Sequence, residues 1–476
     1  MEATMLRLHN TLTRTVEPIR PLRAGSVSMY SCGPTVYRPV HIGNLRSFLL
    51  GDLIRRVLLW SGLSVRQVMN ITDVGHMTDE VYDRGEDKML LAAADEGLTP
   101  AEIAAKYESA FHRDCARLGI LPADVYPRAS DHIGAMIDLI ERLVERGHAY
   151  VDNGSVYYDV TTFPDYGRLS RNSLDQLRAG HRLEEVDHHK RHPADFILWK
   201  AAGPRRVVRF DSPWGEGYPG WHIECSAMSI AYLGERFDLH TGGVDLAFPH
   251  HEDEIAQSEG ALGHPVVSTW VHGDHLLFSG QKMAKSSGNV WTLDRLEEEG
   301  HHPLDFRYLC LTSRYRRQLR FSLDALTAAG KARTRLAAQL AEWRTSAAEP
   351  ESPAAEGWAQ RFRDAVLDDL DFPRAITVVW ALVTDEALSP AERAALLCDW
   401  DRVLGLGLES LAVEAAAAEA QPRDLPVGAA DLLDARQAAR EQRDWPESDR
   451  LRAALHELGV EVSDTPQGTT WHRRGP

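Results

Sequence analysis

Apolar and polar side chains alternate along residues 27–32, and between residue 45 and about residue 60 the apolar positions recur every three or four residues. Strict alternation is typical of a β-strand, and the second spacing is typical of an amphipathic helix. The two patterns predict a strand–loop–helix unit with Cys32 at the end of the strand and His41 just before the helix. Ligands of open α/β sheets bind at the carboxyl ends of strands, where the first N–H groups of a helix can bind phosphate. The position therefore suits a nucleotide site.

Strand and helix patterns continue to alternate along the first half of the chain. A second strand is predicted over residues 64–72, and helices are predicted over about 99–119 and 130–147. The first of these helices begins with a threonine cap, a proline in the first turn and a glutamate three residues after the cap, which together mark a helix start. This order predicts an α/β fold with a doubly wound parallel sheet.

The pattern changes after residue 147. Residues 148–160 are typical of a hairpin that turns at Asp152-Asn153-Gly154, and a polar segment without helical period follows to about residue 210. We therefore predict an insertion in the sheet domain over residues 121–215. Strand and helix patterns alternate again in WHIECSAMSIAYLG, FDLHTGG and FPHHEDEIAQSEG. The segment TWVHGDHLLF that follows is predicted to be one strand.

The last third of the chain is predominantly helical in pattern. From about residue 320 three long segments have helical spacing, whereas residues 346–357 and 413–426 are rich in Ala, Glu and Pro and are predicted to be a loop and a linker. The tail from residue 428 predicts two helices and then a β-hairpin with a Gln-Gly turn. The chain is thus divided into several domains, as its 476 residues suggest.

Composition excludes several classes of protein. The 53 basic and 70 acidic residues give a net charge of −17, which argues against non-specific coating of nucleic acid. The sequence has no apolar run long enough for a membrane span and no secretory h-region, so we expect a cytoplasmic protein that does not bind membranes. The 5 cysteines are scattered and odd in number, which argues against a disulfide scaffold.

Candidate metal ligands gather in three segments. They are His250, His251, Glu252 and Glu254 in PHHEDEIAQ, His222 and Cys225 in WHIEC, and Cys32 in the first loop. His250 and Glu254 are four residues apart and so share one helical face, but pairings of His251 with Glu254 or with Glu252 are alternatives. Because the segments contain no CxxC pair, the spacing alone suggests a zinc site without establishing one; a buried thiol and a solvated helix face explain it equally well.

Two further segments carry candidate binding residues. The loop GQKMAKSSGN holds Lys282 and Lys285, whose ammonium groups could close over a triphosphate, although the loop lacks the P-loop pattern and could be a plain surface loop. The segment SRYRRQLR is the most basic in the chain, and Arg307 precedes it. It could contact an RNA backbone, or it could be solvated or salt-bridged.

Taken together, these motifs resemble one family. CGPTVYRPVHIGN and, about 240 residues later, KMAKS resemble the two signature sequences of class I aminoacyl-tRNA synthetases. Cys32 in its CGPT context, NITD, GWHIECSAM, FPHHEDEIAQS and the terminal PQGTTW narrow the resemblance to the cysteinyl-tRNA synthetase family, over about residues 5–474.

The resemblance implies a Rossmann-type fold and a domain order. The implied segments are a catalytic first half (1–120), a connective insertion (121–215), a catalytic second half (216–285), a stem-contact segment with the KMAKS loop at its start (286–325), a helical bundle (326–412) and a small C-terminal α/β anticodon-binding domain (428–476). The implied reaction is activation of L-cysteine by ATP, with Mg²⁺, to cysteinyl-adenylate and pyrophosphate, followed by transfer to the terminal ribose of tRNA(Cys).

The resemblance also assigns roles to single residues. One zinc ion per chain is expected on Cys32, Cys225, His250 and Glu254, with the substrate thiolate as an additional ligand. Thr72 and Trp221 are expected near the bound amino acid. ATP is expected to contact His41, Gly43, Asn44 and Lys285, and the catalytic residues are expected to be His41, Asn44, Lys282 and Lys285. The chain departs from the common signatures at Asn44, where histidine is frequent, and at Ala284, where serine is commoner.

The chemistry of zinc implies how such a site selects its substrate. Zinc binds thiolate strongly, whereas a serine hydroxyl is a harder and less acidic ligand, so we expect no editing site. The nearest alternative is the ligase that joins cysteine to an amino-sugar in mycothiol synthesis, a relative that lacks the small C-terminal domain. A zinc hydrolase and a non-catalytic RNA-binding protein are weaker alternatives, since neither explains KMAKS together with the ligand set. We expect a monomer.

Overall fold

The computed structural model describes two compact units, residues 1–409 and 410–476. Within them the described residues are 5–74, 77–79, 84–173, 189–203, 206–278, 281–282, 290–343, 352–420, 426, 428–442, 444–465 and 468–473. Lys285 and Ala284 lie outside these ranges. Among the described residues, we find no helix with the length and apolar character that crossing a membrane requires.

A parallel sheet forms the centre of the first unit, which confirms the predicted fold class. Its strands run in the order β12-β11-β3-β4, and every neighbouring pair is parallel. Helix α1 connects β3 to β4, and helix α7 connects β11 to β12. The two crossovers leave in opposite directions, so the strand order reverses between β3 and β11. The bounds are β3 (Ser26–Ser31), α1 (Ile42–Trp60), β4 (Ser64–Met69), β11 (Phe237–Gly243), α7 (His250–Leu262) and β12 (Val267–Gly273).

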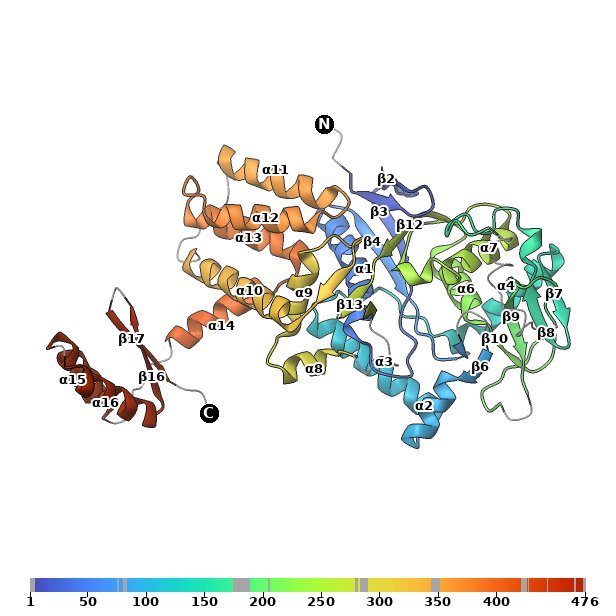
Figure 1. Ribbon diagram of the computed structural model, residues 1–476. Coiled ribbons are helices and arrows are strands. Elements are labelled where there is room, and N and C mark those ends of the chain that lie inside the picture. Colours follow the sequence, from blue (N-terminus) through green and yellow to red (C-terminus); the bar gives the residue numbers. More distant parts are fainter. Residues whose placement is uncertain are drawn as a thin grey trace. The chain divides into compact units, whose positions relative to one another are not determined.

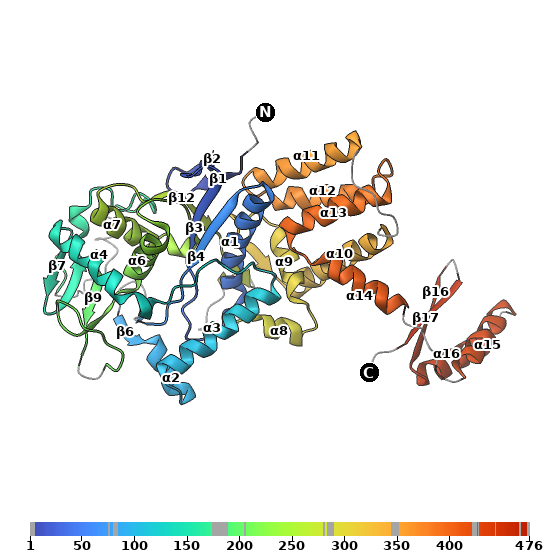
Figure 2. The same cartoon turned by 180° about the vertical axis from the view of Figure 1, so that it is seen from behind.

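Helices cover both faces of this sheet (Figure 1). Figure 2 shows α1 between the sheet and a helical group, with α6, α7 and a small antiparallel sheet on the other side. The helical group is α9 (Pro303–Leu311), α10 (Leu323–Trp343), α11 (Pro353–Leu367), α12 (Phe372–Val383) and α13 (Pro390–Leu404). The other side holds α4 (Ile133–Glu145), α6 (Trp221–Leu233) and the sheet β10 (Gly217–Pro219), β9 (Phe196–Ala201), β8 (Ser155–Tyr158) and β7 (Ala149–Asp152).

Shorter elements complete the two units. In the first unit they are β1 (Arg7–Asn10), β2 (Thr15–Pro18), β5 (Met77–Asp79), β6 (Arg84–Asp87), α2 (Lys88–Glu96), α3 (Pro100–Arg117), β13 (Leu276–Phe278), β14 (Gln281–Lys282), α8 (Leu293–Glu298) and β15 (Leu319–Phe321). Helix α14 (Leu408–Ala420) begins at the end of that unit. The second unit holds α15 (Ala429–Glu441), α16 (Trp445–Glu457), β16 (Val460–Thr465) and β17 (Gly468–Arg473).

Local signals explain several boundaries. Thr99 and Glu102 form a reciprocal capping box at the start of α3, as predicted. The hairpin β7–β8 turns at Asn153 and Gly154, whose φ angles of 47° and 77° both lie in the left-handed region that such tight turns require. The two C-terminal helices and the following hairpin are also confirmed. Because Thr465 pairs with Gly468, Gly468 belongs to β17 and not to the turn.

Three sequence predictions were wrong in their boundaries. The segment TWVHGDHLLF is two strands, because β12 ends at Gly273 and β13 pairs with β15 outside the main sheet. The predicted strand 64–72 ends at Met69, and Ile71 makes only an isolated bridge. The predicted linker 413–426 is helical as far as Ala420, because its alanines and glutamates are strong helix formers.

One buried carboxylate joins four parts of the first unit. Asp52 on α1 accepts hydrogen bonds from Arg307 Nη2 at 2.6 Å and from Arg56 Nε at 2.8 Å. Arg307 is completely buried and also donates to the carbonyl groups of Leu118 and Gly119 at 3.1 Å each, and to the carbonyl of Leu404 at 2.6 Å. The ion pair thus ties α1 to α9, to the end of α13 and to the chain after α3.

We expect the substitution Asp52→Asn to lower the free energy of unfolding by about 3–5 kcal/mol, because it leaves the buried Arg307 cation without its counter-ion. Denaturant unfolding of both proteins measures the difference. The control is Asp165→Asn, which alters a carboxylate 68% exposed and 3.4 Å from Arg168; we expect a change of at most about 1 kcal/mol. Equal effects of the two substitutions would contradict the role assigned to the ion pair.

Candidate active site

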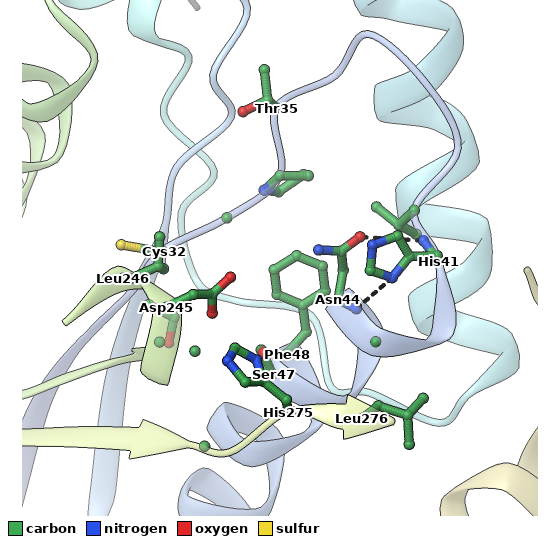
Figure 3. A pocket seen from close by; sticks show the side chains of 18 of the residues that line it. Cys32, Thr35, His41, Asn44, Ser47, Phe48, Asp245, Leu246, His275 and Leu276 are labelled. Carbon is green, nitrogen blue, oxygen red and sulfur yellow. Dashed lines mark hydrogen bonds between the residues drawn. The ribbon is translucent and has the colours of Figure 1, made fainter. Parts of the chain in front are cut away.

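A cavity of about 310 Å³ opens at the carboxyl ends of β3 and β11, where the strand order reverses. Its walls are formed by the loop after β3, the start of α1, the end of β11 and the backbone between β12 and β13. Figure 3 shows Cys32 on one side of this cavity and His41 with Asn44 on the other, with the side chains of Asp245 and His275 between them. A crevice at the reversal point is where open α/β sheets bind their ligands.

The start of α1 forms one wall of the cavity. His41 is the N-cap residue: its Nδ1 accepts the backbone N–H of Asn44 at 3.1 Å, and Asn44 Oδ1 accepts the backbone N–H of His41 at 3.3 Å. Because Nδ1 is an acceptor here, the neutral His41 ring carries its proton on Nε2. A positive helix end and an imidazole N–H therefore border the same cavity, which suits a phosphate group.

Gly43 brings the imidazole close to the helix. A Cβ atom at residue 43 would lie 2.9 Å from both Nδ1 and Cε1 of His41, a distance that real Cβ contacts do not reach. A side chain at this position would therefore displace the His41 ring.

Two thiols, an imidazole and a carboxylate converge beside the opposite wall, which Cys32 lines. One donor atom each from Cys32, Cys225, His250 and Glu254 lies within 4.8 Å of all the others, and all four residues are buried. Cys32 follows β3, Cys225 is on α6, and the other two are on α7. The structure thus brings together the four residues that the resemblance selects.

The spacing of these donor atoms fits a tetrahedral metal site. Cys32 Sγ lies 3.9 Å from Cys225 Sγ and 3.8 Å from Glu254 Oε1, and His250 Nε2 lies 3.2 Å from Glu254 Oε1. Zinc–ligand distances of about 2.3 Å for sulfur and about 2.0–2.1 Å for nitrogen and oxygen give tetrahedral edges of about 3.8, about 3.6 and about 3.3 Å for these three pairs. The donor set is therefore one that Zn²⁺ prefers.

A second group of donors, Cys32, His240, His251 and Glu254, is also compact. Each histidine of this group is within hydrogen-bond distance of one other member: His251 Nε2 lies 3.2 Å from Cys32 Sγ, and His240 Nε2 lies 2.9 Å from Glu254 Oε2. Both are shorter than the corresponding tetrahedral edges. We therefore interpret His240 and His251 as partners of the ligands and not as the ligands themselves.

The protonation states of the thiols and of the neighbouring histidines follow from their burial. Burial raises the pKa of the Cys32 thiol well above its usual range, and it raises the pKa of the Cys225 thiol as well. Burial lowers the pKa of His251 well below its usual range and that of His272 to about 3, so both rings are neutral at physiological pH. A bound cation would instead favour the thiolate form of both cysteines, because a coordinating thiol is deprotonated.

Hydrogen bonds also fix the orientation of His250. Its Nδ1 lies 2.8 Å from His222 Nδ1, and His222 Nε2 lies 3.4 Å from Asp253 Oδ2. Tyr166 donates to Asp253 Oδ1 at 2.5 Å. Metal-binding histidines commonly hold such a partner on the second ring nitrogen, which fixes the ring and its tautomer. The segment after β8 that carries Tyr166 therefore supports helix α7.

The two predicted substrate contacts have different positions. Trp221 lines the cavity, and its ring centroid lies 4.3 Å from that of His250. Thr72 is buried, and its hydroxyl group donates to Glu224 Oε2 at 2.7 Å; the structure does not place it on the wall of the cavity. The assignment of Thr72 to substrate binding stays a prediction.

The predicted phosphate and RNA contacts are described only in part. Lys282 belongs to strand β14, and Lys285 lies outside the described residues. In the basic segment, Arg314 pairs with Asp371, and Arg316 Nε lies 2.8 Å from Asp369. Arg307 is buried in the ion pair with Asp52, so its inclusion among the RNA contacts was wrong. Within that segment the exposed arginines are Arg317 and Arg320.

Sequence reasoning missed two histidines behind the thiols, His240 and His272. His251 Nδ1 lies 2.7 Å from His272 Nε2, whose other ring nitrogen lies 2.8 Å from Thr11 Oγ1. His240 stacks on Trp270 with ring centroids 4.4 Å apart. The available signal was a histidine in each of two predicted strands, which a strand pattern alone does not assign to a site.

Comparison with known proteins first identifies the class. Residues 18–331 match the family model described as tRNA synthetases class I (C) catalytic domain. The Mycobacterium tuberculosis methionyl-tRNA synthetase in complex with methionyl-adenylate has a similar fold, with a TM-score of 0.57 and 16% identity over 83% of this chain and 92% of that one. A second structure of that enzyme gives a TM-score of 0.55 at 15% identity, over 89% and 96% of the two chains. The chain therefore has the catalytic domain of a class I tRNA synthetase.

Further matches define the family within this class. Residues 423–471 match the model described as Cysteinyl-tRNA ligase anticodon binding domain. A cysteine–tRNA ligase of Thermus thermophilus is 44% identical, covering 98% of this chain and 99% of that protein. Cysteine–tRNA ligase 1 of Burkholderia lata is 44% identical, covering 97% and 96%. The chain belongs to the cysteinyl-tRNA synthetase family, whose members use ATP.

We expect Gly43→Ala to weaken ATP binding about 10-fold or more, because the added methyl group displaces the His41 ring from the helix start and removes hydrogen bonds to a charged ligand. Calorimetric titration with ATP measures the change. The control is Gly134→Ala on α4, where an added Cβ meets no atom within 4 Å. ATP affinity that is unchanged in the Gly43 variant would show that the His41 ring does not contribute.

Proposed function

We propose that this protein attaches L-cysteine to tRNA(Cys) in two steps. In the first, an oxygen of the cysteine carboxylate bonds to the α-phosphorus of ATP, and the bond from that phosphorus to the β-phosphate oxygen breaks, which releases pyrophosphate. In the second, a hydroxyl group of the terminal ribose of the tRNA takes the cysteinyl group, and AMP leaves. Family membership and the anticodon-domain match support the proposal.

One observation favours cysteine as the amino acid. Two sulfur atoms, a nitrogen and an oxygen converge around Cys32, which lines the wall of the cavity opposite the start of α1. The residues that would hold one Zn²⁺ ion are Cys32, Cys225, His250 and Glu254. Bound zinc would supply a coordination position that accepts a thiolate sulfur much better than a hydroxyl oxygen.

The residues of the chain would position and shield the amino acid. Trp221 forms an apolar wall beside His250, and the buried rings of His240 and His251 fill the space behind the thiols. An apolar pocket by itself separates close analogues poorly. Recognition of the sulfur atom would make a separate editing site unnecessary.

Activation would rely on positioning and charge. The nucleophile is the substrate carboxylate, so no protein nucleophile is required. His41 would donate from Nε2 to a phosphate oxygen, and the backbone N–H groups at the start of α1 would add the positive end of the helix. Gly43 would let the nucleotide and the imidazole approach the helix. By family resemblance, Lys282 and Lys285 would stabilise charge on the leaving pyrophosphate, with Mg²⁺ bound to ATP.

The C-terminal unit distinguishes the proposed tRNA ligase from the main alternative, a ligase that joins cysteine to an amino-sugar. Helices α15 and α16 pack with strands β16 and β17 around a small apolar core that includes Ala429, Leu455 and Val460. This segment matches the anticodon-binding model, whereas a ligase that acts on a small amino-sugar needs no such domain. A zinc hydrolase would not explain that domain either. tRNA(Cys), L-cysteine and ATP are therefore the proposed partners.

We expect the purified protein to hold one zinc ion per chain, and Cys225→Ala to lose most of it, because the substitution removes one of four ligands. Atomic emission analysis of the purified proteins measures the content. The matched control is Cys310→Ala, which removes a buried thiol outside the ligand set and leaves the zinc content unchanged. A full equivalent of zinc in the Cys225 variant would contradict the ligand assignment.

Transfer of labelled cysteine to a tRNA(Cys) transcript tests the function as a whole. Pyrophosphate release is followed in the same reaction, together with a transcript in which the GCA anticodon is altered. We expect charging of the first transcript and a loss of charging with the second. Pyrophosphate release without charging of either transcript would instead support a ligase whose acceptor is a small amine.

A further inference from the structure

The guanidinium group of Arg46 joins the start of α1 to two segments that are far apart in sequence. Its Nη1 donates to the carbonyl oxygens of Asp274 at 2.6 Å and His275 at 2.7 Å. Its Nη2 donates to the carbonyl oxygen of Arg317 at 2.6 Å and, more weakly, to that of Arg314 at 3.4 Å. The four hydrogen bonds of the side chain therefore all go to the backbone of the two segments.

Because Arg46 is buried, its guanidinium group requires well-formed hydrogen bonds. The residue is 7% exposed, and its hydrogen bonds go to backbone carbonyl groups, with the Asp274 carboxylate near enough to attract the guanidinium group. A buried cation is costly unless its hydrogen bonds are well formed. The planar guanidinium fork can reach several carbonyl groups at once, whereas the single ammonium group of lysine cannot reproduce that arrangement.

Both ends of the contact lead to the proposed ATP site. Arg46 follows His41, Gly43 and Asn44 on the same helix but does not itself line the cavity. Asp274 and His275 do line it, and they come directly before β13. Strand β13 pairs with β14, which contains Lys282, and along its other edge with β15.

Backbone hydrogen bonds make the two clamped segments one unit. The N–H of Asp274 donates to the carbonyl of Tyr315 at 2.8 Å, and the N–H of Leu319 donates to the carbonyl of His275 at 3.1 Å. Arg46 is the side chain that connects this unit to α1 through four carbonyl groups. Movement of the unit relative to α1 would break those hydrogen bonds.

We propose that Arg46 is a positioning residue for adenylate formation, which sets the place of β13 and of its partner β14 with Lys282 relative to the ATP-binding start of α1. The inference rests on the proposed function. Arg46 touches neither substrate in this arrangement and acts through the backbone at residues 274–275. Loss of the fork would misplace groups that stabilise the transition state, and a shift of about 1 Å in such groups costs on the order of 100-fold in rate.

The test compares Arg46→Lys with Arg55→Lys in cysteine-dependent ATP–pyrophosphate exchange. Arg55 is a matched control on the same helix: it also donates to a backbone carbonyl, that of Pro122, and to Asp124, but lies away from the cavity. We expect Arg46→Lys to lower kcat/KM for ATP by about 10- to 100-fold. We expect its KM for cysteine and its zinc content to stay within about twofold of the wild-type values, because no zinc ligand contacts Arg46. Arg55→Lys should leave all these quantities within about twofold.

Three results would overturn the inference. They are an unchanged kcat/KM for ATP in Arg46→Lys, a rise in the KM for cysteine as large as the loss of kcat/KM for ATP, and an equal loss of kcat/KM for ATP in both variants. If Arg46→Lys does not fold, Arg46→Gln is measured in its place, and failure of both to fold would assign Arg46 a purely structural role. A wild-type protein without cysteine-dependent exchange would instead refute the proposed function, so the two failures are distinguishable.

Discussion

The reversal of strand order between β3 and β11 is the constraint on which the rest of the site depends. Because α1 and α7 cross over in opposite directions, the carboxyl ends of the two neighbouring strands are left uncovered. The loop after β3 then brings Cys32 and the cap of α1 to the same opening. A sheet wound in one direction would cover this edge with a crossover, and neither the thiol nor the helix start would face a cavity.

The polar groups behind the thiols are buried together, and this makes them depend on one another. His251 contacts Cys32 and His272, and His240 contacts Glu254. Each group would be costly to bury alone, but as a network the hydrogen bonds offset much of that cost. The network also restricts the rotamers of the ligands, so a metal would meet donors that are already arranged. Tyr166 contributes by donating a hydrogen bond to Asp253 on α7, which links residues after β8 to the helix that carries His250 and Glu254.

Local patterns predicted much of the fold but only part of the site. Capping at Thr99 and the turn at Asn153-Gly154 involve adjacent residues, so the sequence displays them directly. Helical spacing likewise placed His250 and Glu254 on one face, but it left His251 as an equal choice, and the resemblance to a family resolved the set. The ion pair of Asp52 with Arg307 and the carbonyl contacts of Arg46 join residues more than 200 positions apart. No local pattern encodes such contacts, because they arise only when the sheet and the helices pack.

X-ray absorption at the zinc edge counts the sulfur atoms around the metal and so tests whether the thiol of the amino acid is recognised there. We expect two sulfur ligands in the protein alone, those of Cys32 and Cys225. We expect one additional sulfur ligand when cysteine is added and no change when serine is added. If the sulfur count stays the same with cysteine, selection of the amino acid does not depend on its thiol, and the proposed role of zinc is wrong.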